Sequence, residues 1–261
     1  MKTNFLQSTE NKKIIGKKGN YNIVEYVKDV SVNMETAPIE YYAAEMNVRK
    51  RQVAIEMNNS EVVVQTGAMQ WMAGDVSAAT NIKGAGDLAK KMLGAAVTKE
   101  SAIKPKYTGS GLLVLEPTYK HLIILDMNDW AEGIVMDDGL FLACDSSIDI
   151  KTVARSTISS ALLGNEGLFN TMLYGTGNAV IESDVPASEL VLVSLENDTL
   201  KVDGNFAIAW SKSLDFTVEK TTKSLIGSAA TGEGLVNVYR GTGKVFMAPV
   251  MSTMRAVLNT K

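Results

Sequence analysis

The sequence predicts an all-β protein, a sandwich or barrel assembled from three tandem copies of one unit. A phrase with two closely spaced glycines occurs three times, and each copy runs into an apolar segment that favours a strand. Turn signals separate short apolar runs about every 8 to 12 residues, which is typical of sandwiches and barrels. The three phrases are Tyr107-Thr108-Gly109-Ser110-Gly111, Tyr174-Gly175-Thr176-Gly177 and Arg240-Gly241-Thr242-Gly243.

The spacing of these phrases is regular. Gly109 and Gly175 are 66 residues apart, and Gly175 and Gly241 are again 66 residues apart. A unit of this length has too small a core to be stable alone with ease, so we expect the copies to bury their faces against one another. The prediction is a single pseudo-threefold body over residues 1–261, with modules at 20–115, 116–182 and 183–250 and a tail at 251–261.

Strands and turns can be assigned along the first module. A polar, lysine-rich lead comes first, and β-favouring runs follow at Tyr21–Val27 and Gln52–Met57. We expect Asn58-Asn59 to form a turn and Glu61–Gln65 to resume a strand.

The later modules repeat this pattern. Strands are expected at His121–Leu125, Leu190–Leu195 and Thr199–Val202, with turns at Asn128-Asp129 and Glu196-Asn197-Asp198. A further turn recurs at one place in each module: Thr66-Gly67, Asp138-Gly139 and Asp203-Gly204.

A connector rich in Ser, Ala and Gly joins the two halves of each module. In the first connector, four apolar residues from Leu88 to Ala96 have helical spacing and Asp87 stands near their start, so we expect a short amphipathic helix there. Residues Val153–Leu163 of the second connector are another candidate helix. The three connectors are Gly84–Ser101, Thr152–Gly164 and Thr221–Gly232.

The composition is that of an ordinary soluble globular protein, with 46% hydrophobic and 21% charged residues. A net charge of −3 and a pI near 5.4 argue against nucleic-acid binding, since a phosphate-binding surface would have to be a local patch. The dense basic run, Lys12-Lys13 with Lys17-Lys18, is either a solvated tail or turn or a site for an anionic partner.

Cysteine usage and hydropathy indicate a cytoplasmic protein. The single cysteine, Cys144, excludes an internal disulfide and fits a reducing compartment. No apolar stretch reaches the roughly 18 residues of a membrane span, and the first residues lack the apolar core of a signal peptide. We expect no transmembrane segment, while peripheral membrane association stays open.

The nearest approach to a cofactor motif is Gly84-Ala85-Gly86-Asp87-Leu88-Ala89. A dinucleotide site requires a buried strand before the glycines, and Val76–Asn81 is a poor one. Asp87 would also place a negative charge where a pyrophosphate should bind. We interpret these glycines as the start of a helix, and the repeated glycine pairs as bends or bulges in strands, so no cofactor-binding residue is assigned.

Single residues offer candidates for chemistry, each with a structural alternative. His121, the one histidine, begins an apolar strand, and a structural or surface role outweighs that of a general base. Cys144 has no Cys-His signature around it and is expected to be an inert thiol. No catalytic residue is assigned.

Acidic and aromatic residues are interpreted in the same way. The acidic pairs at Asp137-Asp138, Asp126 with Asp129, and Asp145 with Asp149 fit solvated turns and lack the spacing of a calcium loop, so no metal ligand is assigned. Trp71 and Trp210 are expected in the core. Trp130 lies next to a turn, where exposure would make it an interface anchor.

The glycine phrases and their surroundings resemble those of the Aim-type (altered inheritance of mitochondria) family. The resemblance covers roughly residues 40–250 and rests on Gly67-Ala68-Met69, on Glu166-Gly167-Leu168-Phe169 and on Gly232-Glu233-Gly234-Leu235-Val236, the last two leading to the later glycine pairs. It implies a TRAP-like β-fold, named after a tryptophan-binding RNA attenuator, and no established reaction. The family's fungal member is linked to mitochondrial inner-membrane organisation; we expect no targeting sequence in this chain, so that localisation is not carried over.

These observations favour a non-catalytic β protein that binds a partner or associates with itself, as a scaffold or assembly component. The alternative is a small-molecule binder or enzyme whose site is composed across the modules. RNA binding by analogy of fold is disfavoured by the acidic pI. A deep pocket with converging polar groups would favour a ligand, and a large apolar patch would favour association.

Overall fold

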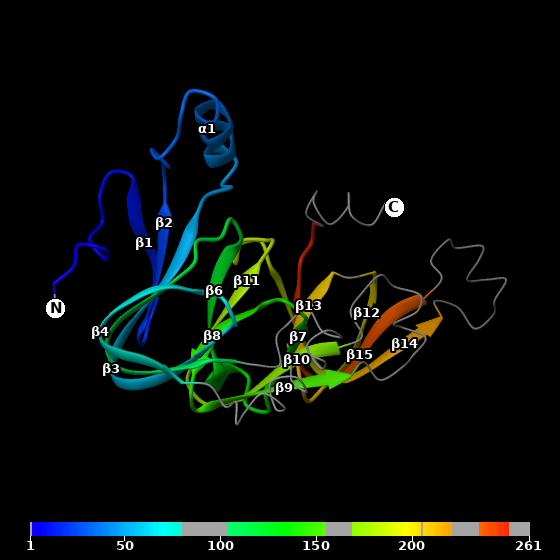
Figure 1. Ribbon diagram of the computed structural model, residues 1–261. Helices are drawn as coiled ribbons and strands as arrows, with labels where there is room; N and C mark the ends of the chain where they lie inside the picture. Colours follow the sequence, from blue (N-terminus) through cyan, green and yellow to red (C-terminus); the bar gives the residue numbers. More distant parts are fainter. Residues whose placement is uncertain (1, 80–103, 155–168, 205, 221–234, 251–261) are drawn as a thin grey trace, which may run out of the picture.

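The computed structural model describes residues 2–79, 104–154, 169–204, 206–220 and 235–250. Their regular structure is almost entirely β, in antiparallel strands, which confirms the predicted all-β fold (Figure 1). One α-helix and one short 3-10 helix accompany the strands. The elements are β1 (Lys12–Lys18), β2 (Tyr21–Tyr26), α1 (Ala37–Glu45), β3 (Arg51–Val64), β4 (Met69–Ala79), β5 (Lys106–Leu115), β6 (His121–Asp126), η1 (Met127–Asp129), β7 (Ile134–Asp137), β8 (Phe141–Asp145), β9 (Ile148–Ala154), β10 (Phe169–Gly175), β11 (Asn178–Ser183), β12 (Val191–Asp203), β13 (Ala207–Ser211), β14 (Asp215–Lys220) and β15 (Leu235–Met247).

The strands form two sheets. The first has the order β1-β2-β3-β8-β11-β6, and β5 pairs with both β3 and β4. It curves until the end of β1 meets β6, where Lys18 Nζ lies 2.8 Å from Asp126 Oδ2. The second sheet has the order β12-β15-β13-β7-β10-β9, and β14 pairs with β15.

Residues 116–182 contribute to both sheets. Their strands β6, β8 and β11 lie in the first sheet, whereas β7, β9 and β10 lie in the second. One core cluster accordingly contains Phe141 and Ile181 from the first sheet and Ile134, Met136 and Leu173 from the second. The two sheets are therefore joined through a common apolar interior.

The first and third glycine pairs lie within strands, and the second lies where β10 ends and the chain turns into β11. Gly109 is on β5, Gly175 ends β10 just before β11 begins, and Gly241 is on β15. All three have positive φ, and a methyl group at Gly109 would lie 1.9 Å from the carbonyl oxygen of Asp75. Glycine is required there because neighbouring backbone occupies the space of a side chain.

Two predicted turns are β-bulges inside long strands. The turn expected at Asn58-Asn59 is wrong, because β3 continues through it with a register shift between Met57 and Ser60. The turn expected at Glu196-Asn197-Asp198 is wrong for the same reason, since β12 is continuous. Asn59 and Asn197 have φ of 45° and 52°, a conformation that asparagine tolerates and that lets a strand absorb an extra residue.

The lysine-rich lead and the predicted helices also need correction. The lysine run is neither tail nor turn but the edge strand β1, where lysines oppose pairing with other chains. The candidate helix Val153–Leu163 is wrong at its start, because Val153 lies in β9, paired with β10. Ala154 also lies in β9, and residues 155–163, the expected helix at Leu88–Ala96 and the motif Gly84–Ala89 lie outside the described residues.

Candidate functional site

Two neighbouring features at one end of the first sheet are candidates for function. One is the excursion over residues 27–50, which connects β2 to β3 and carries α1. The other is a pocket between the N-terminal segment and strands β2, β3 and β4. Figure 1 shows α1 standing clear of both sheets, at the top of the view.

A buried ion pair anchors the base of the excursion. Arg51 is 2% exposed and Glu25 is 6% exposed, so both charges are removed from water. Arg51 Nε and its terminal NH2 group lie 2.8 Å and 2.7 Å from Glu25 Oε2. Arg49 binds the other oxygen of the same carboxylate at 3.1 Å. Charges buried in this way are stable only when they are paired and hydrogen-bonded.

Further polar contacts position α1. Arg51 donates to Asn47 Oδ1 at 2.8 Å, just beyond the C-terminal end of the helix. On the side of the helix nearer the sheet, Glu40 accepts a hydrogen bond of 2.7 Å from the hydroxyl of Tyr119. No residue of α1 is buried, so this helix is held by polar contacts and not by an apolar core.

The outer side of α1 and the residue that follows it carry an exposed apolar stripe, in which the Tyr42 ring contacts that of Tyr41 edge-on at 5.4 Å. Ile39, Tyr42 and Met46 are 68%, 69% and 78% exposed. Their spacing of three and four residues places them on one face of the helix. An isolated exposed apolar residue is ordinary, but a contiguous group marks a surface for interaction. Other exposed apolar residues of the excursion are Val30, Met34, Tyr41 and Val48.

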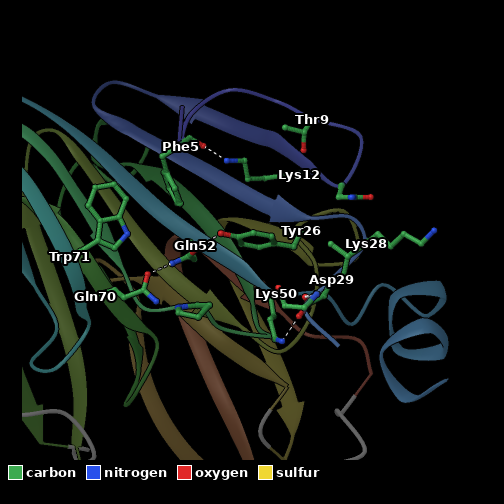
Figure 2. A pocket seen from close by; sticks show the side chains of 14 residues that line it. Phe5, Thr9, Lys12, Tyr26, Lys28, Asp29, Lys50, Gln52, Gln70 and Trp71 are labelled. Atoms are coloured by element: carbon green, nitrogen blue, oxygen red, sulfur yellow. Dashed lines mark hydrogen bonds and ion pairs between the residues drawn. The ribbon is translucent and has the colours of Figure 1, made fainter. Parts of the chain in front are cut away.

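The pocket has a volume of about 660 Å³ and contains a chain of polar contacts. The Tyr26 hydroxyl donates to Gln52 Oε1 at 2.6 Å, and Gln52 Nε2 donates to Gln70 Oε1 at 2.8 Å. Figure 2 shows Phe5 and Trp71 at one end of the pocket and the ion pair of Lys50 with Asp29 at the other. The pair shifts both groups toward their charged forms, lowering the pKa of Asp29 and raising that of Lys50.

Lys12 lines the same pocket from β1. Its Nζ donates to the carbonyl oxygen of Phe5 at 2.5 Å and lies 4.8 Å from the centre of the Phe5 ring. Burial lowers the pKa of Lys12. In the described part of the chain no carboxylate forms an ion pair with it.

A second hollow, of about 890 Å³, lies beside β3 and β5 and includes Glu56, Asp75 and Ser110. Glu56 is already engaged there, since it accepts hydrogen bonds from Asn22 and Lys17 at 3.0 Å each. Among the described residues, no group of three or more His, Cys, Asp or Glu side chains is placed to hold a metal ion.

Most of the candidate site residues named from the sequence have structural roles in the fold. His121 is half-buried at the start of β6, where burial and then the charge of Arg51 lower its pKa. Cys144 is a fully buried free thiol, and burial raises its pKa. Asp145 joins two strands, accepting from the Tyr21 hydroxyl at 3.0 Å and from Asn178 N at 2.7 Å.

The tryptophans differ from their predicted roles in part. Trp210 is buried as expected, and Trp71 is half-buried against Phe5, their ring centres 5.2 Å apart. Trp130 is 5% exposed and packs in the common core against Phe246, so exposure as an interface anchor is wrong. Trp130 N donates a hydrogen bond of 3.0 Å to the carbonyl oxygen of Met127 in the short helix η1.

The sequence indicates Lys12 as part of the basic run, for which a site for an anionic partner is one interpretation, whereas Arg51, Glu25 and α1 were missed. One local signal was available: Pro38 and Glu40 follow Thr36 in the arrangement that begins a helix. No local signal pairs Glu25 with Arg51, because their contact depends on β2 lying beside β3.

The family can be assigned from comparison with known proteins. A family profile described as mitochondrial biogenesis AIM24 matches residues 44–250. The chain belongs to the AIM24 family. The resemblance proposed from the glycine phrases is thereby confirmed, and the AIM24 match begins inside α1, so β1, β2 and most of the excursion lie outside it.

Relatives of this AIM24 family member are found in Streptococcus pyogenes. An uncharacterized protein of serotype M6, M6_Spy0233, is 29% identical over 198 residues, which are 73% of this chain and 77% of that protein. The X-ray structure of protein SPYM3_0169 from the same species is similar with a TM-score of 0.57 and 26% identity, covering 82% of this chain and 94% of that one. Neither description names a function. Within the described residues, no helix has the length and hydropathy needed to cross a membrane.

Proposed function

We propose that this protein is a non-catalytic binding component that associates with further copies of itself through the apolar stripe of α1. The observation that carries the proposal is the exposure of Ile39, Tyr42 and Met46 on one helix face. A helix with an apolar face gains stability by burying that face against another surface. Because the described body of the chain leaves it in solvent, we infer that another molecule covers it.

The charges beside the stripe favour a protein over a membrane surface. Glu35 and Glu45 are exposed and flank the apolar residues, and neither forms an ion pair with another residue that the structure describes. Anionic lipid would repel these carboxylates, whereas a protein surface edged with lysine would attract them.

The chain itself offers such a surface. The edge strand β1 carries Lys13, exposed and without a carboxylate partner in the described part of the chain, and exposed Ile15 beside it. A net charge of −3 is small, so two copies repel each other weakly. Acidic, apolar α1 of one copy is complementary to the basic N-terminal hairpin of the next.

Sedimentation velocity over a range of concentrations tests this function. We expect the wild-type protein to associate in the micromolar range. The triple variant Ile39→Ser, Tyr42→Ser, Met46→Ser should be monomeric while keeping its circular dichroism spectrum. The matched control, Val191→Ser with Leu192→Ser, removes exposed apolar side chains from β12 and should associate like the wild type.

Two outcomes would overturn the proposal. A wild-type protein that stays monomeric at every concentration excludes self-association through α1. Monomeric protein that sediments with vesicles of phosphatidylserine and phosphatidylcholine would instead assign the stripe to a membrane surface.

We further propose that the three modules are copies that fold alike. Matching contacts in the second and third modules support this: Ser147 Oγ donates to Thr176 O at 2.6 Å, and Ser213 Oγ donates to Thr242 O at 2.8 Å. The serines are 66 residues apart, like the glycine pairs. Ser147→Ala and Ser213→Ala should each lower the free energy of unfolding by about 1 kcal/mol. A marked difference between the two losses, measured by urea denaturation, would count against equivalent modules.

A cytoplasmic location and a TRAP-like arrangement stay parts of this proposal. The buried, unpaired Cys144 is consistent with a reducing compartment. Fractionation of the source cells tests the location. A small-molecule role is the second candidate, favoured by the pocket beside β1.

A further inference from the structure

The pocket beside β1 is basic although the chain as a whole is acidic. Its lining contains Lys12, Lys28 and Lys50 but, among the described residues, a single carboxylate, Asp29. Asp29 is paired with Lys50, and Figure 2 shows the Lys28 side chain extending away from the pocket, so Lys12 carries the surplus positive charge. A concave surface with surplus positive charge concentrates anions.

Lys12 is placed to receive an anionic group. An ammonium group has three donors, and the Phe5 carbonyl occupies one of them. The lowered pKa of Lys12 is the expected result when a charge is partly removed from water without an opposite charge beside it. A bound anion would supply that charge.

An aromatic wall and an amide complete the site. Phe5 and Trp71 meet edge to face at the end of the pocket near Lys12, as Figure 2 shows. Trp71 is half-buried, so part of the indole is open to a ligand. Gln70 is exposed and its amide oxygen accepts from Gln52, which leaves the amide N–H groups available as donors. Pockets for small molecules combine apolar walls with a few fixed polar groups in this way.

We propose that this pocket binds a small organic anion, with an apolar ring against Phe5 and Trp71 and a carboxylate or phosphate group at Lys12. Gln70 lines the same pocket and offers its amide N–H groups to other polar atoms of the ligand. The function is binding, and no bond is made or broken.

Calorimetric titration of the full-length protein tests the site with three probes. Cinnamate has a ring and a carboxylate, cinnamyl alcohol has the ring without the charge, and acetate has the charge without the ring. We expect measurable binding of cinnamate and, because a charge-assisted hydrogen bond is lost, affinity at least about tenfold weaker for the alcohol. Acetate should bind more weakly than cinnamate.

Two lysine variants test whether Lys12 contacts the carboxylate of cinnamate. Lys12→Gln should weaken cinnamate binding by about tenfold, since the amide cannot supply the charge. Lys17→Gln is the matched control: Lys17 stands on the same strand but pairs with Glu56 outside this pocket, and its loss should leave cinnamate affinity unchanged. The indole N–H resonance of Trp71 should shift on titration, while those of buried Trp130 and Trp210 stay in place.

Several results would overturn the proposal: no cinnamate binding, equal affinity for acid and alcohol, an unaltered affinity in Lys12→Gln, or a shift at Trp130 or Trp210 in place of Trp71. The triple variant of α1 should bind cinnamate like the wild type, because none of its three substituted residues lines the pocket. The cinnamate titration and the sedimentation experiment therefore test the pocket and the self-association independently.

Discussion

At the scale of single residues, two separate constraints favour glycine at the repeated positions. One is the backbone conformation, and the other is the room left for a side chain. Gly109 and Gly241 have φ of 124° and 117°, so both adopt a conformation that other residues rarely take. They differ in their surroundings. A side chain at Gly109 would meet the Asp75 carbonyl at 1.9 Å, whereas the nearest atom to one at Gly241 is 3.7 Å away.

We therefore predict that Gly109→Ala destabilises the protein more than Gly241→Ala. Both variants incur backbone strain of about 1–3 kcal/mol. Gly109→Ala adds overpacking against immobile backbone, a further loss of about 1–3 kcal/mol. Urea denaturation measures the two unfolding free energies, and equal losses would show that space around Gly109 is unimportant.

The buried pair of Arg51 and Glu25 makes a second prediction at this scale. Arg51→Met leaves Glu25 with Arg49 alone in a buried position, and we expect a loss of about 3 kcal/mol in unfolding free energy. Lys17→Met breaks an exposed pair with Glu56 and should cost no more than about 1 kcal/mol. Replacing both buried partners, Arg51→Met with Glu25→Leu, should recover part of the loss. A similar loss of unfolding free energy in Arg51→Met and Lys17→Met would contradict the argument from the buried charge of Glu25.

At the scale of elements, the pairing of strands β14 and β15 is strengthened by a bidentate ion pair at the surface. Arg240 lies 2.6 Å and 2.7 Å from the two oxygens of Glu219, and Thr217 also donates to that carboxylate at 3.0 Å. These hydrogen bonds, chiefly that of Arg240, lower the pKa of Glu219 from 4.5 to about 2. The charged form of Glu219 is therefore favoured in the folded strand pair.

The pH dependence follows from the direction of this shift. Because the folded pKa is depressed, the contribution of Glu219 is complete above 4.5 and is lost as the pH falls toward about 2. Carbon-detected NMR titration of the Glu219 carboxyl should show the low value in the wild type and a return toward 4.5 in Arg240→Gln. An unchanged pKa in that variant would remove Arg240 as the cause.

At the scale of the whole molecule, residues 116–182 join the two sheets by placing strands in both. The common core cluster contains side chains from each sheet, and it includes Trp130. Trp71 packs on the first sheet, and Trp210 lies in a separate cluster of the second. The three tryptophans therefore report on three parts of the interior.

Because one core cluster contains side chains of both sheets, we predict that both sheets unfold in one cooperative transition. Protein labelled with fluorotryptophan should show the same urea midpoint for Trp71, Trp130 and Trp210 by fluorine NMR. Assignment uses one tryptophan-to-phenylalanine variant for each position. A midpoint for Trp71 well separated from that of Trp210 would indicate sheets that fold independently.

The sequence by itself determined the all-β class, the family and the places where glycine is required, because strand propensity, turn chemistry and backbone sterics act over a few residues. The tertiary structure decided the rest. It converted the asparagine turns at 59 and 197 into bulges, since a long strand pairs on both sides of them. It brought Lys12 into one pocket with Trp71 and placed Glu25 beside Arg51, and the described residues leave the stripe of α1 uncovered. Such contacts depend on which strands become neighbours, which short-range patterns do not encode.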